Sequence, residues 1–366
     1  MNMVPYSGFV IWVLLLLSST WPLVGSTKAH GGRAGKFSVY RDVRIRKEFT
    51  TMSYGERKRF VRAYKFVSTH QPFKRRFEYL VGLHQRLFKK VHVEKQFFPW
   101  HRWYLLQFEN LLRRVDPRIT LPYWDWSIRS QRLWETGRKS VWNNYPWGLG
   151  GNGTGMFSCV DTGPFSKRTW RLAPKSGGGC LRRNFIGRMP SVVTVHRTLR
   201  YTAKQFKIFE DQIREFYHNE LHCCIQGTME LPSASNTPEF LLHHTFMDKL
   251  WYDWQSKGPG YKFKIEDNLA SRLRGSHYQV GQFMDPSHLG YSDTSVYYKD
   301  PLPGYKRLHA ALGLLDLKAL KMLDSYDWNS KSTCCPKENN DVERKGREID
   351  KSLTDIPLEV ALDYGG

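Results

Sequence analysis

The sequence predicts a mainly α fold, in which four core helices are joined by long, irregular, disulfide-stapled loops. Apolar residues recur every three or four positions in four separate stretches, which is the spacing of one helix face. Pro99 and Pro238 stand where two of these stretches begin, and proline is well tolerated in the first turn of a helix. Residues 128–190 are instead rich in Gly, Pro, Ser, Trp and Arg and show no clear period. With 366 residues, 40% of them hydrophobic, the chain can bury a substantial core.

The first 26 residues have the pattern of an export signal. An apolar run from Phe9 to Leu17 is followed by small residues around Gly25 and Ser26 that suit cleavage. The run is too short and too quickly interrupted to span a bilayer well, so a membrane anchor is the less favoured alternative. Residues 27–56 are polar and basic, and we expect them to form a loose N-terminal arm.

Two helices are predicted in the first half of the chain. Residues 57–91 place apolar side chains, with His84 among them, on one helical face. The next helix begins near Pro99, carries His101 on its apolar stripe and ends at Asp116-Pro117.

Two more helices follow at about 203–222 and from Thr237-Pro238 to about Trp254. We therefore assign residues 57–256 to the core domain. Residues 257–336 are interpreted as a mostly irregular C-terminal extension packed on that domain, with one helix near 316–324. Residues 337–366 form a charged tail that is low in apolar residues and is expected to be disordered.

Six cysteines fit an exported protein that folds in an oxidising compartment. Cys159 and Cys180 bracket a Gly/Pro-rich loop, so we pair them. The two vicinal pairs, Cys223-Cys224 and Cys334-Cys335, could bond to each other one or both ways. Asn152-Gly-Thr154 is a glycosylation sequon in a glycine-rich stretch, where we expect it to be exposed.

The net charge is +22, and residues 27–118 hold 23 Lys or Arg against 7 Asp or Glu, a local excess of +16. Such an excess favours polyanionic partners. Because the sequence carries no nucleic-acid-binding signature, we expect acidic extracellular matrix polymers rather than nucleic acid. A basic surface that serves only solubility is the alternative.

The histidines of the second half have the spacing of a metal site. His218 and His222 stand at i and i+4, one turn apart on one helix face, although such pairs are also often incidental. His244 shares a helix face with Phe240, Met247 and Trp251, so it could join His218 and His222 at a metal. The neighbouring His243 points about 100° away and is expected to make structural hydrogen bonds.

The first half offers a matching set in His84, His92 and His101. A single histidine on an apolar face is more often a satisfied core residue than a ligand, but three in each half favour metal binding. Six neutral nitrogen ligands suit copper better than calcium or magnesium. Zinc remains an alternative on ligand type alone.

Four motifs make the chain resemble the tyrosinase and haemocyanin family of type-3 copper proteins over residues 60–256: FFPWHRWYLLQFE, LPYWDWS, HNELHCCIQGTM and NTPEFLLHHTFMDKLWYDWQ. The form of these motifs that contains HRWYLL, together with CLRRNF, is similar to that of secreted molluscan tyrosinase-like proteins. The resemblance implies an antiparallel four-helix bundle holding a dicopper centre, with O2 as bound cosubstrate. Its ligands are His84, His92 and His101 for the first copper (Cu A), and His218, His222 and His244 for the second (Cu B). His70, beside Gln71-Pro72 at a predicted helix end, is the alternative to His84.

The resemblance also suggests roles for residues around the ligands. Phe240 matches a phenylalanine that covers the copper site and stacks on substrate, with core packing as the alternative. Glu210 and Asn219 match a pair that holds a water for deprotonating the phenol; solvation of the helix surface is the alternative for each. Asp248 and Asp125 are candidates to orient a ligand imidazole, and Asp125 is equally a candidate to cap the core.

The function implied is that of a secreted copper oxidase that hydroxylates monophenols, oxidises o-diphenols to o-quinones, or does both. Its partners would be phenolic small molecules or the tyrosyl and DOPA groups of proteins, with no nucleic acid, and no membrane once the signal is cleaved. Matrix tanning or pigmentation, such as in shell formation, follows by analogy only. A reversible O2-binding protein of the haemocyanin kind and a catalytically silent matrix scaffold are the alternatives.

Overall fold

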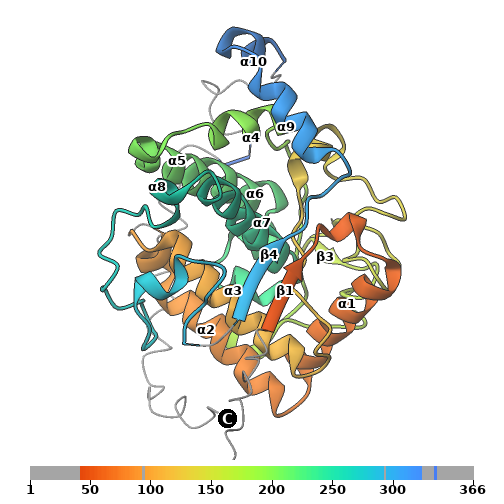
Figure 1. Ribbon diagram of the computed structural model, residues 1–366. Helices are drawn as coiled ribbons and strands as arrows, with labels where there is room; N and C mark the ends of the chain where they lie inside the picture. Colours follow the sequence, from red (N-terminus) through yellow and green to blue (C-terminus); the bar gives the residue numbers. More distant parts are fainter. Residues whose placement is uncertain (1–41, 93–94, 292–293, 324–333, 336–366) are drawn as a thin grey trace, which may run out of the picture. The chain divides into compact units, whose positions relative to one another are not determined.

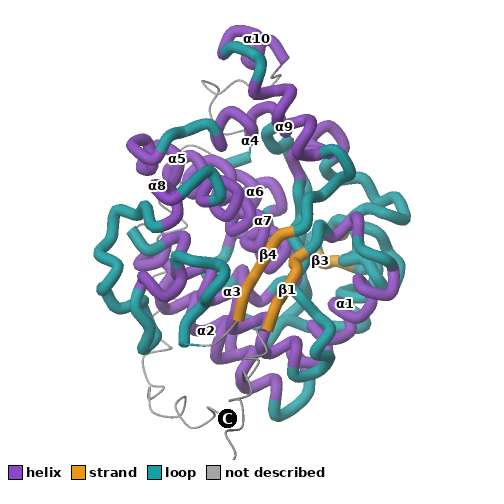
Figure 2. Tube along the Cα trace, viewed as in Figure 1, coloured by secondary structure: helices purple, strands orange, loops and turns teal. Residues whose placement is uncertain are grey.

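The computed structural model describes residues 42–92, 95–291, 294–323 and 334–335 (Figure 1). The predicted signal segment, residues 27–41 of the arm and the tail over 337–366 lie outside these residues. The described chain is mainly helical (Figure 2), as the sequence predicts. Its α-helices are α1 (Tyr54–Thr69), α2 (Phe73–His92), α3 (Phe97–Arg113), α4 (Val192–Leu199), α5 (Phe206–Asp211), α6 (Asn219–Ile225), α7 (Pro238–Gln255), α8 (Pro259–Lys262), α9 (Tyr305–Gly313) and α10 (Leu317–Leu323).

Local signals in the sequence explain where the helices begin and end. Ser53 and Glu56 form a reciprocal capping box at the start of α1. The face predicted over 57–91 belongs to two helices, because Pro72 interrupts the backbone hydrogen bonding between α1 and α2. Pro238 occupies the first turn of α7, where its missing N–H leaves no helical bond unmade.

The helix predicted at 203–222 is a continuous helical run of three parts. α5 passes into a π-helical turn, Gln212–His218, and then into α6. The run ends at Gln226, whose φ of 60° lies in the left-handed region that a non-glycine residue rarely adopts. Irregular helix of this kind is frequent at functional sites, and here it delivers His218 and His222.

The core forms where these helices meet. α3 contacts α2 and α7, and α7 contacts the π-helical turn. Aromatic side chains fill much of the space between them, and Trp100, Trp251 and Trp254 are fully buried. In the described residues, no helix is both long and apolar enough to cross a membrane.

Three disulfides cross-link the loops to this core. Cys159–Cys180 closes the glycine-rich region, as the sequence predicts, beside the short antiparallel pair β2 (Gly153–Thr154) and β3 (Cys159–Val160). Cys223–Cys335 and Cys224–Cys334 join the vicinal pairs, so both of the bonds that the sequence left open are formed.

The loose arm predicted over 27–56 is wrong for residues 42–56. β1 (Asp42–Arg46) pairs in parallel with β4 (Thr294–Tyr298), side by side in Figure 1. The strand inverts the usual alternation: Arg46 is 0% exposed, whereas Val43 and Ile45 are 52% and 49% exposed. Sequence patterning assigns apolar residues to the inside, which is why the polar, basic pattern of this segment predicts a loose arm.

The described part of residues 257–336 is also more regular than predicted. α10 confirms the helix expected near 316–324, but α9 and β4 were missed. β4 is a short strand whose only strand partner in the described chain is β1, more than 240 residues earlier, so no local hairpin signal marks it.

The arginine side chains of β1 are buried because they form ion pairs with buried carboxylates. Arg46 binds Glu109 of α3 through Nε and Nη2 at 3.2 and 3.1 Å, and Asp248 of α7 through Nη1 at 3.2 Å. Asp248 also accepts from Arg102 Nε at 2.7 Å and from the hydroxyl of Tyr298 at 2.5 Å. Burial alone would raise the pKa of Glu109, but the charges of Arg46 and Arg44 and the hydrogen bonds that Glu109 accepts together outweigh burial and lower that pKa. The network ties β1 and β4 to α3 and α7, the helices that carry His101 and His244.

We predict that Arg46→Ala destabilises the protein by roughly 3–5 kcal/mol, because it leaves two buried carboxylates short of a counter-charge. Denaturant unfolding of the purified variant measures the change. Arg118→Ala is the matched control: its partner Asp116 lies in an exposed surface pair, so no measurable change is expected. Equal stability of the two variants would contradict the role assigned to the network.

Candidate metal centre

Six histidines from four helical segments converge in the core. α2 supplies His84 and His92, and α3 supplies His101. The π-helical turn ends at His218, α6 supplies His222 one turn later, and α7 supplies His244. The sequence predicts each of these six, and the structure brings them together as two groups of three, within each of which one ligand atom per residue lies within 4.8 Å of the others.

The two groups lie against each other. The rings of His101 and His244 have centroids 4.6 Å apart and are nearly parallel. The rings of His92 and His218 lie 5.1 Å apart. Two metal ions held by these groups would therefore be neighbours rather than separate sites.

The second ring nitrogen of five of the six histidines is held by an oxygen. In four of them Nδ1 donates to a backbone carbonyl: His84 to Pro232 (2.8 Å), His92 to Phe88 (2.7 Å), His101 to Phe97 (2.8 Å) and His222 to Met229 (2.6 Å). In the fifth, His218 Nδ1 donates to the side-chain oxygen of Asn219 at 2.8 Å. Such bonds fix the proton on Nδ1 and leave the lone pair of Nε2 free to bind a metal ion.

The Nε2 atoms complete the pattern of a metal site. In the described chain, Nε2 of His84, His92, His101 and His218 is buried and has no hydrogen-bond partner. Nε2 of His222 lies 3.3 Å from Nε2 of His244. Buried polar atoms without a partner are rare in native proteins and costly, and one cation in each histidine group would satisfy these Nε2 atoms.

Burial keeps the six imidazoles neutral. It lowers the pKa of His84 to about 3 and that of His222 to about 4. The pKa values of His92, His101, His218 and His244 also lie well below the usual value, because burial and neighbouring histidines both disfavour a positive charge. Neutral rings offer the lone pairs that a metal requires.

The structure places His84, and not His70, with His92 and His101. His70 is exposed at the end of α1, where its ring stacks on Phe66 and contacts Thr69. His243 behaves as predicted for a structural residue, because its Nε2 donates to the carbonyl of His218 at 3.2 Å.

Phe240 covers the junction of the two groups. Its ring stacks on His244 with centroids 3.9 Å apart and meets the edge of the His84 ring at 5.0 Å. It is fully buried, so it excludes water from the histidines whatever further role it has.

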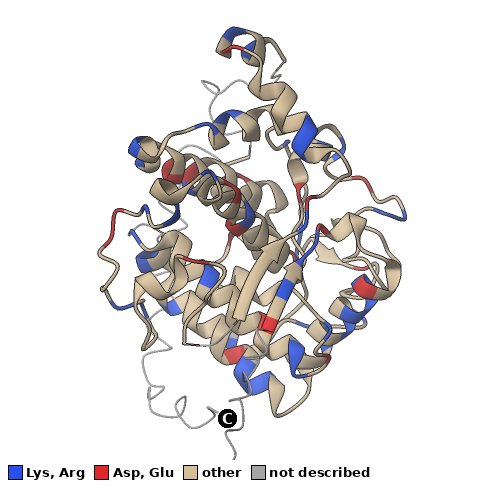
Figure 3. Cartoon of the chain, in the orientation of Figure 1, with Lys and Arg blue, Asp and Glu red and all other residues tan. Residues whose placement is uncertain are grey.

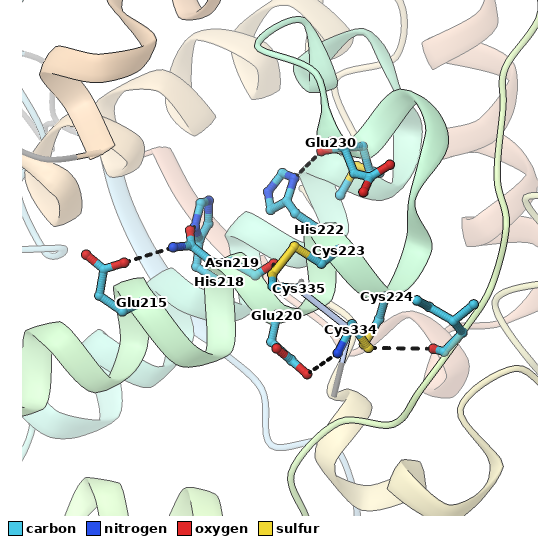
Figure 4. The surroundings of a disulfide bond; sticks show 12 residues. Glu215, His218, Asn219, Glu220, His222, Cys223, Cys224, Glu230, Cys334 and Cys335 are labelled. Carbon is cyan, nitrogen blue, oxygen red and sulfur yellow. Dashed lines mark hydrogen bonds between the residues drawn. A yellow bond between two sulfur atoms is a disulfide. The ribbon is translucent and has the colours of Figure 1, made fainter. Parts of the chain in front are cut away.

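Asn219 has a different carboxylate partner from the one the sequence suggested. Its Oδ1 accepts from His218 and its Nδ2 donates to Glu215 at 2.9 Å (Figure 4). Glu210 instead accepts from Arg214 Nε at 3.0 Å, and Arg214 also pairs with Glu215. Glu215 was missed, although its position four residues before Asn219 is a helical contact spacing.

The roles suggested for Asp248 and Asp125 in orienting an imidazole are wrong. Asp248 belongs to the buried arginine network. Asp125 accepts from the backbone N and the hydroxyl of Ser127, capping the turn that follows it. Four backbone carbonyls and the side chain of Asn219 orient the rings instead. No sequence motif marks such carbonyls, because every residue has one.

A further group, Glu220, Cys224 and Cys334, also brings potential ligand atoms together. Both sulfurs are bonded to each other, so they offer no thiolate to a metal.

These features define a helical protein with two adjacent three-histidine metal sites. The family model described as the common central domain of tyrosinase matches residues 65–257. The tyrosinase of Streptomyces glaucescens is 32% identical over 243 residues, which cover 59% of this chain and 84% of that protein. The chain belongs to the tyrosinase family, and the two histidine groups are able to hold that family's pair of copper ions.

Solved structures share the fold. A mutant polyphenol oxidase from Thermothelomyces thermophila aligns with a TM-score of 0.57 at 21% identity, over 70% of this chain and 89% of that one. Deoxygenated hemocyanin from Rapana thomasiana aligns with a TM-score of 0.51 at 20% identity, over 75% of this chain and 74% of that one. At these identities the likeness concerns the fold alone.

We predict that His84→Gln lowers the copper bound by the purified protein from two ions per chain to one. Elemental analysis after dialysis measures this number. His70→Gln is the matched control and is expected to retain two, since His70 lies outside the histidine groups. Loss of copper in the His70 variant, with two ions kept by the His84 variant, would reverse the assignment.

Proposed function

We propose that this protein is a secreted copper oxidase of the tyrosinase type, which oxidises o-diphenols to o-quinones with O2 and hydroxylates monophenols. The observation that carries the proposal is the contact between the two histidine groups, 4.6 Å between the rings of His101 and His244. Two adjacent copper ions, when bound there, supply the redox chemistry with O2 as cosubstrate. The protein supplies the ligands, the dry surroundings and the handling of protons.

The second group of histidines is the side from which we expect a phenol to enter. His222 and Asn219 are partly exposed, while His84, His101 and His244 are buried. Phe240, stacked on His244, would then guide the phenol ring. We propose that the ring of the substrate approaches beside Asn219.

The carboxylate of Glu215, beside Asn219, is suited to accept the phenolic proton. The hydrogen bond from Asn219 Nδ2 holds Glu215, and Arg214 holds both Glu215 and Glu210. We propose that Asn219 and Glu215 together take the role that the resemblance gave to Asn219 and Glu210. Glu210 remains the second candidate, because burial raises its pKa and a raised pKa suits a general base.

An acidic matrix polymer is the partner that the charge supports. Figure 3 shows many basic positions along α1 and α2. A cavity of about 700 Å³ between the end of α1 and residues 167–174 is lined by Lys74, Lys167, Arg168 and Arg171, with no acidic residue among the described residues that line it. With three disulfides and a predicted signal segment, this supports secretion and, by analogy, a role in matrix tanning or pigmentation, as in shell formation.

The copper-loaded protein is predicted to convert DOPA and O2 steadily to the o-quinone, and to stop when a chelator removes the metal. Absorbance of the quinone follows the reaction, with His244→Gln as an inactive control. Reversible uptake of O2 without turnover would instead indicate a carrier, and absence of bound copper a silent scaffold.

We predict that Glu215→Gln lowers monophenol hydroxylation roughly tenfold or more, because the variant cannot accept the phenolic proton. Oxidation of an o-diphenol by the same variant should fall less. Glu210→Gln is the matched control on the same helical run and is expected to keep the wild-type ratio of the two activities. A selective loss in the Glu210 variant alone would return the role to Glu210.

A further inference from the structure

The helical segment that carries His222 of the second group is irregular at both of its ends. α6 has only seven residues, between a π-helical turn and Gln226 at a φ of 60°. α6 is the last part of the helical run that begins at Phe206, and the π-helical turn before it interrupts the regular α-helical hydrogen bonding, so tertiary contacts must set its orientation. Yet it must hold His222 against His244, where the two Nε2 atoms lie 3.3 Å apart.

Cys334 and Cys335 are cross-linked to α6 at two adjacent positions. Cys335 bonds to Cys223 and Cys334 to Cys224, the two residues that directly follow His222 (Figure 4). Adjacent residues point about 100° apart around a helix. A single bond would leave the helix free to pivot about it, whereas two bonds in different directions also fix its rotation.

Further contacts of the same two residues reach the first turn of α6. The backbone N–H of Cys334 donates to Glu220 Oε1 at 3.1 Å. The sulfur of Cys335 lies 3.5 Å from the carbonyl oxygen of Asn219, the residue whose side chain holds His218. The attachment thus spans α6 from Asn219 to Cys224 and includes the neighbours of both ligands.

We propose that Cys334 and Cys335 form a positioning strap for the second metal site. Through the two disulfides the strap fixes the rotation of α6, so that His218 and His222 stay aligned with His244. It acts on copper affinity at this site and not at the site of His84, His92 and His101. The proposal concerns metal binding and stands without the oxidase activity.

The test compares variants from which bonded cysteines are removed in pairs, so that no free thiol is left to bind copper. Cys223→Ser/Cys335→Ser removes the partly exposed bond and keeps Cys224–Cys334, which secures the fold. A second variant replaces all four cysteines. Cys159→Ser/Cys180→Ser is the matched control, because this disulfide closes a loop outside α6. Copper(II) binding is measured by equilibrium dialysis against a competing chelator, and near-ultraviolet circular dichroism checks folding.

The Cys223→Ser/Cys335→Ser variant (the paired variant) is expected to bind copper at the second site roughly 10–100-fold less tightly than the wild type does, which is the range found when support around metal ligands is lost. The variant lacking all four cysteines should lose at least as much, and the control should bind both ions normally. Combining the paired variant with His84→Gln should retain the effect on the remaining ion. Combining it with His244→Gln should abolish the effect.

An unchanged second affinity, an equal loss at both sites, or the same loss in the Cys159/Cys180 control would overturn the proposal. If the copper binding follows the expected pattern but DOPA is not oxidised by the wild type, the proposed oxidase function fails and the strap does not.

Discussion

The burial of six imidazoles is the constraint on which the rest of the structure depends. A buried polar atom without a partner costs about 1–3 kcal/mol, and this core holds such atoms on several histidines at once. Five rings solve half of the problem by donating Nδ1 to an oxygen. A cation in each group would satisfy the Nε2 atoms, so metal binding would contribute to the stability of this core as well as to its chemistry.

Interactions outside the metal centre hold the ligand helices in position. On one side, Arg46 reaches from β1 to carboxylates of α3 and α7, the helices that carry His101 and His244. On the other side, two disulfides hold α6, which carries His222. Permanent cross-links and buried charge pairs both resist small rotations, and small rotations are what would separate ligands from different helices.

How much the sequence could predict depends on the range of the interaction. The ligand histidines follow helical spacing, which is local, and the family motifs order them. The inside position of Arg46 depends on Glu109 and Asp248, distant in sequence, so the alternation of β1 misled the assignment of the arm. Glu210 came from the family resemblance, whereas the contact between Asn219 and Glu215 depends on side-chain geometry around the π-helical turn, which no motif of the sequence marks.

Anomalous diffraction at the copper edge, from crystals of the copper-loaded protein, tests the central claim most directly. The account predicts two neighbouring peaks. One would be bounded by the Nε2 atoms of His84, His92 and His101, and the other by those of His218, His222 and His244. A single peak, or copper bound at His70 or elsewhere with these Nε2 atoms left unligated, would contradict it.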